Sequence, residues 1–124
     1  MERNYIYQYN KKLDIIAMER ALKYLEGKND FTSFTSLDKT EKEKDCIRIL
    51  SDTSIKRIDE QIEISFLGNG FLKYMVRNIV GTLIEIGEGK RKSEDIINIL
   101  EKKNRKFAGK TANPEGLYLK HVYY

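Results

Sequence analysis

The strongest pattern of hydrophobic and polar positions in the chain runs from Gly70 to Gly87. At about 100° per residue, its apolar side chains cover roughly 220° of a helical wheel, which predicts a long helix buried on more than one side. The rest of the wheel is a narrow polar strip, which consists of Lys73, Tyr74, Arg77, Asn78, Gly81, Thr82 and Glu85. The chain is therefore expected to be organised around this helix.

Arg77 lies at the edge of this polar strip, and Gly81 follows it by one turn. A guanidinium beside a core is costly unless an anion meets it. The missing side chain of Gly81 is expected to leave room for such an anionic partner. Two interpretations are open from the pattern alone: Arg77 pairs with a structural carboxylate, or it holds a functional carboxylate or phosphate.

Shorter patterns predict the other regular elements. Alternating or apolar runs predict strands over residues 5–9, 46–50, 61–66 and 117–124. Helical spacing predicts a helix over residues 13–25, which Gly27 is placed to end, and another that opens at Ser93 as its capping residue and continues to Leu100. On the first strand, three tyrosines share one face, namely Tyr5, Tyr7 and Tyr9.

The connections between these elements are polar. Residues 51–60 are expected to join two strands as a hairpin, and residues 37–45 to form a mobile loop or the lead-in to that hairpin. Residues 28–34 are expected to form a loop whose Phe31 and Phe34 fill part of the core. The order of elements predicts one α+β domain over residues 1–124, a split β-α-β arrangement with an antiparallel sheet and helices on one face.

The charge of the chain is concentrated in residues 88–110, here called the basic segment. This segment holds eight Lys or Arg residues and four Asp or Glu residues, and so the whole formal net charge of +4. Such a patch suits a polyanion such as nucleic acid or an acidic membrane surface, although a solvated face is the simpler alternative. Its basic residues are Lys90, Arg91, Lys92, Lys102, Lys103, Arg105, Lys106 and Lys110.

Several kinds of site find no support in the sequence. Cys46 is the only cysteine and His121 the only histidine, so a disulfide framework, a thiolate or histidine metal site and a catalytic triad are not expected. Residues 108–111 resemble the end of a phosphate-binding loop, but Asn104 stands where that motif needs glycine and Pro114 follows where a helix should begin.

Glu63 and Glu85 could be proposed as a catalytic carboxylate pair, but ion-paired or solvated acids are the preferred interpretation. No apolar run is long enough to span a membrane, because Lys73 and Arg77 interrupt the longest one. No hydrophobic signal region follows Met1, so a cytoplasmic protein is expected.

Five segments of the chain, taken in order, resemble the C-terminal half of tRNA pseudouridine synthases of the A family. The most specific of them is the Phe-Leu-x-x-Met-Val-Arg-x-Ile-Val-Gly signature that begins at Phe71. The resemblance extends from end to end of the chain. The segments are Arg3–Tyr7, Gly27–Phe34, Gly70–Leu83, Ala108–Ala112 and Gly116–Tyr124.

The resemblance implies an isomerase that converts uridine to pseudouridine at positions 38 to 40 of the tRNA anticodon stem-loop, without metal or organic cofactor and as a homodimer. Tyr5 would be the active-site tyrosine that packs on the uracil, and Arg77 would pair with the catalytic aspartate. Leu117 would line the uracil pocket, with Lys73 and Asn78 as further substrate-binding residues. The RNA-binding residues would be Lys90, Arg91, Lys92, Lys102, Lys103 and Arg105.

The chain departs from the family pattern in four respects, the first of which is a shorter connection between Asn10 and Leu13, before the first helix. The stretch Arg-Thr-Asp-x-Gly-Val-His that carries the family's catalytic aspartate does not occur in it, so the chain alone is expected to be inactive and the N-terminal half to be absent. The first strand is one residue shorter after Tyr7, which leaves Tyr5 and Tyr7 as alternatives for the stacking role. Lys44 stands where the family has arginine. A non-catalytic RNA-binding or dimerisation module is the alternative function.

Overall fold

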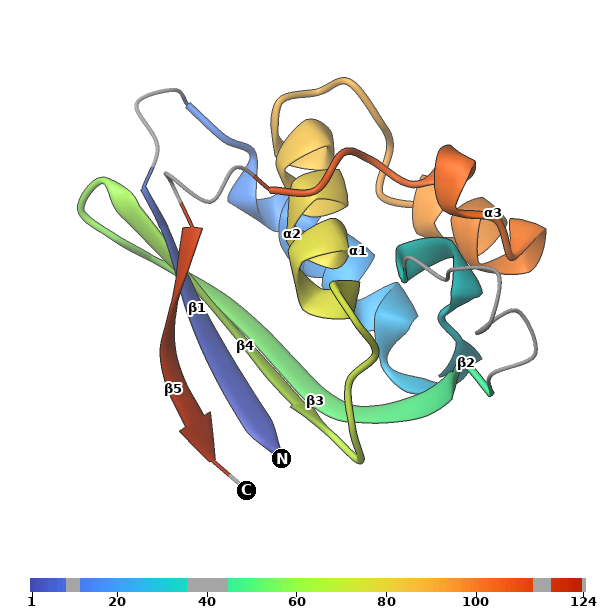
Figure 1. Ribbon diagram of the computed structural model, residues 1–124. Coiled ribbons are helices and arrows are strands. Elements are labelled where there is room, and N and C mark those ends of the chain that lie inside the picture. Colours follow the sequence, from blue (N-terminus) through green and yellow to red (C-terminus); the bar gives the residue numbers. More distant parts are fainter. Residues whose placement is uncertain (9–11, 36–44, 113–116, 124) are drawn as a thin grey trace.

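The structure is a computed structural model of the 124-residue chain, and it describes residues 1–8, 12–35, 45–112 and 117–123. The described part contains β-strands, α-helices and two 3₁₀ turns (Figure 1). In chain order the elements are β1 (Glu2–Gln8), α1 (Ile15–Leu25), β2 (Gly27–Asp30), the 3₁₀ turn η1 (Thr32–Phe34), β3 (Ile47–Ile58), β4 (Gln61–Gly68), α2 (Met75–Gly87), α3 (Asp95–Lys102), the 3₁₀ turn η2 (Arg105–Phe107) and β5 (Leu117–Tyr123).

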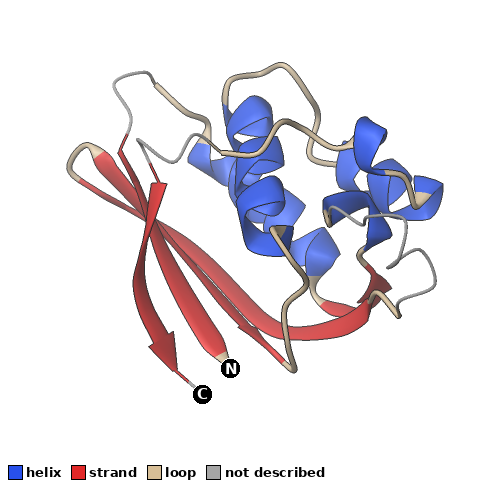
Figure 2. Cartoon of the chain, viewed as in Figure 1, coloured by secondary structure: helices blue, strands red, loops and turns tan. Residues whose placement is uncertain are grey.

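The strands form one sheet in the order β2-β3-β4-β1-β5, and every neighbouring pair is antiparallel. β1 therefore lies inside the sheet although it begins the chain, and β5 is an edge strand beside it. The three α-helices cover one face of this sheet, as Figure 2 shows. The predicted α+β class with an antiparallel sheet and helices on one face is confirmed.

The core lies between the helices and the covered face of the sheet. Alternate residues of β4 point into it, and Ile62, Ile64 and Phe66 are completely buried. The helices contribute residues such as Leu22 and Ile79, which are equally inaccessible. Phe31 and Phe34 also have no exposed surface, so the prediction that these two rings fill the core is confirmed.

α1 begins and ends close to where the sequence predicts. Its first turn is capped by the Asp14 side chain, which accepts a hydrogen bond from the Ala17 N–H at 3.1 Å. The helix stops at Leu25, and Gly27 adopts a φ of 93°, a left-handed conformation that glycine reaches without strain.

Two predicted connections are strands instead. β3 continues through the polar stretch to Ile58, and only Asp59 and Glu60 form the turn to β4, so the expected connection over residues 51–60 is wrong. Polar side chains suit this strand because every second one faces away from the helices toward solvent. Residues 27–30 pair with β3 as strand β2, so part of the loop expected over residues 28–34 is also wrong.

The two later helices start further along the chain than expected. α2 begins at Met75 and not at Gly70, because Tyr74 has a φ of 60° and interrupts the helical path. Ser93 does not cap α3 with its side chain, since its hydroxyl donates to the Ala17 carbonyl oxygen at 2.7 Å. The loop expected over residues 37–45 lies almost wholly outside the described residues.

Candidate functional site

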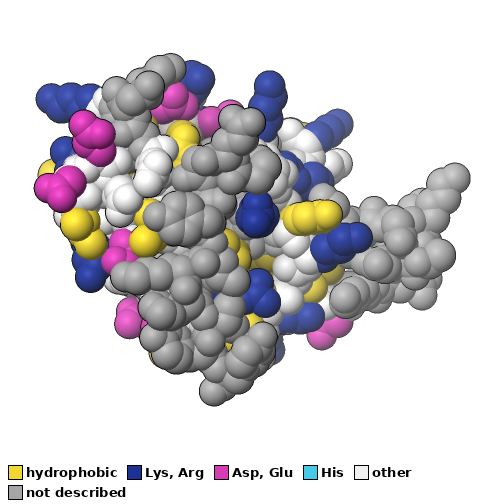
Figure 3. Space-filling view, turned by 60° about the vertical axis from the view of Figure 1, so that its left-hand side comes forward, with side chains coloured by type: hydrophobic (Ala, Val, Ile, Leu, Met, Phe, Trp, Pro, Cys, Tyr) yellow, Lys and Arg dark blue, Asp and Glu magenta, His cyan; other side chains and the backbone are white. Residues whose placement is uncertain are grey.

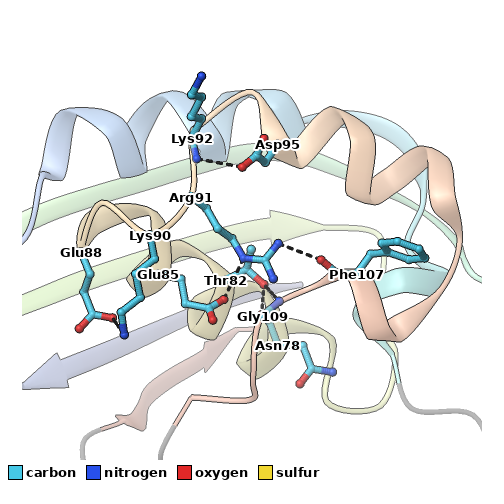
Figure 4. Close-up of polar contacts among 10 residues, drawn as sticks. All are labelled: Asn78, Thr82, Glu85, Glu88, Lys90, Arg91, Lys92, Asp95, Phe107 and Gly109. Atoms are coloured by element: carbon cyan, nitrogen blue, oxygen red, sulfur yellow. Dashed lines mark hydrogen bonds and ion pairs between the residues drawn. The ribbon is translucent and has the colours of Figure 1, made fainter.

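The polar strip of α2 is largely covered by the chain segment of residues 108–112. The segment runs along the helix in the opposite direction, so that Gly109 meets Thr82 while Ala112 meets Arg77. Gly109 N–H donates to the Thr82 hydroxyl at 2.8 Å, a contact drawn in Figure 4. Ala112 N–H donates to the Arg77 carbonyl oxygen at 3.1 Å.

Two glycines allow this close approach. The Lys110 carbonyl oxygen lies where a Cβ of Gly81 would be, and Thr82 and Glu85 leave no room for a Cβ at Gly109. The space beside Gly81 is thus filled by backbone of the same chain. The expectation that an anionic partner fills this space is wrong. Gly81 instead makes room for the backbone of residues 108–112.

Asn78 is the centre of the polar contacts under this segment. Its side chain is completely buried, and its amide group donates to the Phe34 carbonyl oxygen at 2.8 Å. Its Oδ1 accepts from the Thr111 hydroxyl and from Arg105 Nη2, the latter at 3.1 Å. The expected contact of Asn78 with substrate would require these internal bonds to break.

Arg77 precedes Asn78 but its side chain is placed differently. The residue lies in the first turn of α2 and is half-buried. Within the described residues, its guanidinium has neither a hydrogen-bond acceptor nor a carboxylate nor an aromatic ring as partner. A half-buried cation that no described residue neutralises favours an anion as its partner. The interpretation that Arg77 pairs with a structural carboxylate finds no such partner here.

Tyr5 and Tyr7 lie on the face of β1 that the helices cover. They are opposite Ile64 and Ile62 of β4, whose side chains point into the core. Tyr5 is 4% exposed, and its ring packs edge-on against Phe66 with 6.4 Å between ring centroids. Tyr9 lies outside the described residues.

Tyr7 is only half-buried, and its surroundings affect its ionisation. Burial, and then the negative charge of Glu88, raise the pKa of the Tyr7 phenol above its ordinary value. The phenol therefore keeps its proton more firmly than a tyrosine in water. On the other side of β1, Leu117 of β5 is opposite Tyr7, and Leu119 is opposite Tyr5.

Arg3 is a further residue on this face of β1 that the sequence did not single out. Its guanidinium carbon lies 4.7 Å from the centroid of the Phe71 ring, and its Nε is buried without a hydrogen-bond partner. Phe71 belongs to the loop before α2, so this contact joins the end of β1 to the segment that leads to Arg77. Lys73, in the same loop, is exposed, and its ammonium lies 5.5 Å from the centroid of the Tyr74 ring.

The side chains of the first three cations of the basic segment differ in their contacts. Arg91 is held firmly, because its Nε lies 3.1 Å from a Glu85 oxygen and its Nη1 donates to the Phe107 carbonyl oxygen at 2.9 Å (Figure 4). Lys90 has a longer contact with Glu88, at 3.5 Å. Lys92 has an exposed side chain and uses only its backbone N–H to bind Asp95.

The remaining predicted RNA-binding residues follow α3. Lys102 and Lys103 are exposed, whereas Arg105 is half-buried against Asn78 and Thr111. Burial lowers the pKa of Arg105, and the charge of Glu85 acts in the opposite sense. Figure 3 shows one face of the molecule, on which some Lys and Arg side chains lie beside hydrophobic ones. The RNA-binding role of this segment stays a prediction.

Several other expectations concern acids and metal ions. Glu85 pairs with Arg91, and Glu63 with Lys56 at 3.8 Å, so both carboxylates are ion-paired as expected. Within residues 1–8, 12–35, 45–112 and 117–123, His, Cys, Asp and Glu side chains form no group of three or more that could hold a metal ion. In the same ranges, each helix is too short or too polar to cross a membrane.

Comparisons with known proteins agree on one family. A family model described as tRNA pseudouridine synthase matches residues 21–124. A tRNA pseudouridine synthase A of Geobacillus sp. is 50% identical over 122 residues, which are 98% of this chain and 48% of that protein. Proteins of the same name from Oceanobacillus iheyensis and Acetivibrio thermocellus are 46% and 43% identical, over 99% and 98% of this chain and 48% and 49% of their own. The chain thus spans about half the length of these relatives.

Proposed function

Because the chain belongs to the tRNA pseudouridine synthase family, we propose that it supplies one half of an active site that isomerises uridine in tRNA. The target would be positions 38 to 40 of the anticodon stem-loop. In this reaction the bond between N1 of uracil and C1′ of the ribose breaks, the base turns, and C5 bonds to C1′. C5 then loses its proton, and N1 takes up one.

The observation that carries this proposal is the position of Arg77. Its guanidinium is half-buried in the first turn of α2 and has no partner among the described side chains. An arginine in this state favours a carboxylate brought by another part of the protein, which it can hold through two parallel hydrogen bonds. We propose that the carboxylate is the catalytic aspartate, carried by the Arg-Thr-Asp-x-Gly-Val-His stretch that the sequence of this chain does not contain.

We assign the stacking role to Tyr5. A uracil taken out of the RNA stack needs an aromatic ring to pack on, and β1 carries two. Tyr5 is 4% exposed and Tyr7 is half-buried, so stacking on Tyr5 requires the surface over its ring to open when RNA binds. The raised pKa of Tyr7 makes its phenolate harder to form, which disfavours Tyr7 for removal of the C5 proton. Leu117 lies opposite Tyr7 on the adjacent strand β5, and we propose it as the residue that lines the uracil pocket.

Two further residues complete the proposed site. Lys73 is exposed just before α2, where its ammonium can reach a phosphate of the bound RNA. Asn78 keeps the first turn of α2 attached to the segment of residues 108–112 through Thr111, and to η2 through Arg105. The partners of the complete enzyme would be tRNA and a second copy of the protein.

The experiment is reconstitution of activity from two pieces. The chain would be mixed with the part of the Geobacillus relative that it does not match, and tRNA transcribed with uridine tritiated at C5 would be added. Isomerisation releases the tritium to water, so its rate reports the reaction directly. We expect release only from the mixture, because the chain alone lacks the aspartate stretch.

Two results would count against the proposal. Release by the chain alone would show that the chemistry does not need the missing aspartate. Binding of tRNA by the mixture, with both pieces folded and associated but without release, would favour the alternative of a non-catalytic RNA-binding or dimerisation module. A fused version of the two pieces serves as the positive control, since it removes any failure of association.

A further inference from the structure

Phe107 is an exposed aromatic residue that is held on a rigid turn. Its side chain belongs to η2 and is 38% exposed. Its N–H donates to the Asn104 carbonyl oxygen at 3.2 Å, and its own carbonyl oxygen accepts from Arg91 at 2.9 Å. Figure 4 shows the ring pointing away from the Arg91 and Glu85 pair. The backbone that carries the ring is therefore held by hydrogen bonds on both sides.

Two lysines lie around this ring. The ammonium of Lys102 is 5.5 Å from the ring centroid, and that of Lys106 is 5.4 Å from it. Neither ammonium forms an ion pair with a carboxylate of the described residues. A cation near the face of an exposed ring is held only weakly. Both ammonium groups are thus available to a stronger anionic partner at little cost.

The sequence around this ring is mostly positively charged. Residues 101–110 contain five Lys or Arg residues against a single acid, Glu101. Arg105 is half-buried and its described polar contacts are with neutral groups, the Asn78 amide oxygen and the Thr111 hydroxyl. Positive charge around an exposed ring is the combination that favours a ligand with both phosphates and aromatic rings.

We propose that Phe107 is a stacking platform for an unpaired base of bound RNA, with Lys102 and Lys106 binding the adjacent phosphates. This inference rests on the proposed tRNA substrate and adds a contact to it that is separate from the uracil site at Tyr5 and Arg77. Proteins recognise RNA largely through unstacked bases that pack on aromatic rings, and such stacking depends little on base identity. When a base covers the ring, each ammonium moves to a phosphate.

The test uses the absence of tryptophan from the sequence. In the variant Phe107→Trp, the only indole of the chain lies at the proposed platform. Titration with a tRNA transcript is expected to quench the indole fluorescence, while the affinity for tRNA, measured from the anisotropy of labelled tRNA, stays close to that of the unaltered chain. Tyr24→Trp on α1, where the tyrosine is 39% exposed, is the matched control and should show no quenching.

Two further variants test the roles of ring and cations separately. Phe107→Ala is expected to weaken tRNA binding about tenfold, because one base loses its stacking partner. Replacing both Lys102 and Lys106 by glutamine should lower the slope of the logarithm of affinity against the logarithm of salt concentration by roughly one to two, because two phosphate contacts are lost. Circular dichroism confirms that each variant is folded.

The outcomes separate this site from the proposed function. If tRNA binds but Phe107→Trp is not quenched and Phe107→Ala binds as tightly as the unaltered chain, the platform is wrong while the proposed function stands. Quenching by vesicles of anionic phospholipid and not by RNA would also overturn it, in favour of a membrane surface as the partner. If the unaltered chain and the reconstituted enzyme bind no tRNA, the proposed function fails and the platform fails with it.

Discussion

Arg77 and Asn78 are neighbours in α2, yet their polar groups are in opposite situations. The Asn78 amide is completely buried, and its nitrogen and oxygen both bond to atoms of the same chain. The Arg77 guanidinium is half-buried and meets no partner within the described residues. A polar group that is buried without a hydrogen-bond partner costs free energy, whereas a buried group with its partners in place avoids that cost. The comparison therefore separates a residue that stabilises the fold from one that has no partner within the described residues.

The difference extends along the helix. One side of the polar strip, formed by Asn78, Gly81 and Thr82, is closed by the backbone of residues 108–112. On the side that carries Arg77, the contact with that segment within the described residues is a backbone hydrogen bond from the Ala112 N–H to the Arg77 carbonyl oxygen. Substitutions on the closed side should therefore lower the free energy of unfolding, and substitution of Arg77 should leave it nearly unchanged.

The largest expected effect is that of Gly81→Ala. A Cβ at this position would overlap the Lys110 carbonyl oxygen, and a backbone atom cannot rotate away as a flexible side chain can. We expect a loss of about 3 kcal/mol in the free energy of unfolding, measured by urea denaturation. Gly70→Ala is the control, since its Cβ would meet only the Arg48 side chain at 3.6 Å. Equal stability of the two variants would mean that the segment is not closed on α2.

Asn78→Ala should have a somewhat smaller effect. The substitution leaves the Phe34 carbonyl and the Thr111 hydroxyl without their partner and opens a small cavity. A loss of about 2 to 3 kcal/mol is expected from unsatisfied buried polar groups. Asn98→Ala, at an exposed position of α3, controls for the change of residue type. A loss no larger than that of the control would show that Asn78 is not the centre of the closed side.

Thr82→Val tests a single bond of the closed side. Valine keeps the shape of the side chain but cannot accept the hydrogen bond from the Gly109 N–H. We expect a loss of about 1 to 2 kcal/mol, because a buried N–H is left without an acceptor. Thermal unfolding followed by circular dichroism gives the value. If stability is retained, the Gly109 N–H must find another acceptor, and the closed side is less tightly defined than the contact indicates.

A smaller effect concerns Tyr7, and it depends on pH. Because burial and Glu88 raise the pKa of the Tyr7 phenol, the unfolded chain loses this proton at lower pH than the folded chain does. The stability that Tyr7 contributes is therefore complete below the ordinary pKa of about 10 and falls as pH rises through the folded value. Tyr7→Phe should reduce the alkaline loss of stability, seen as a smaller decrease of the urea midpoint between about pH 9 and pH 11. An unchanged decrease would contradict the raised pKa.

Much of the fold could be predicted from local sequence patterns. The burial of Phe31 and Phe34 follows from two aromatic rings with no strand or helix period to explain them. The start of α2 could not be predicted, since the left-handed conformation of Tyr74 interrupts a run whose apolar spacing continues to Gly70. The second part of β3, residues 51–58, could not be predicted either, because its polar side chains resemble a connection until the paired strand β4 is present.

The sequence allowed some residues of the candidate site to be predicted, but not the contacts between them. The edge position of Arg77 in an apolar helix already singled it out. The filling of the space at Gly81 by Lys110 could not be read locally, because the two residues are brought together only by the fold. Phe107 was missed because it belongs to no periodic pattern, although an aromatic residue among lysines is itself a signal for nucleic-acid binding.

The substitution Arg77→Gln in the reconstituted enzyme tests the central claim most directly. Both the free energy of unfolding of the chain and the rate of tritium release from C5-labelled tRNA would be measured, with Arg20→Gln on the exposed side of α1 as control. We predict that the free energy of unfolding changes by no more than about 0.5 kcal/mol, while the rate of tritium release falls by about a hundredfold or more. A loss of stability like that of Asn78→Ala, or release at the rate of the control, would contradict it.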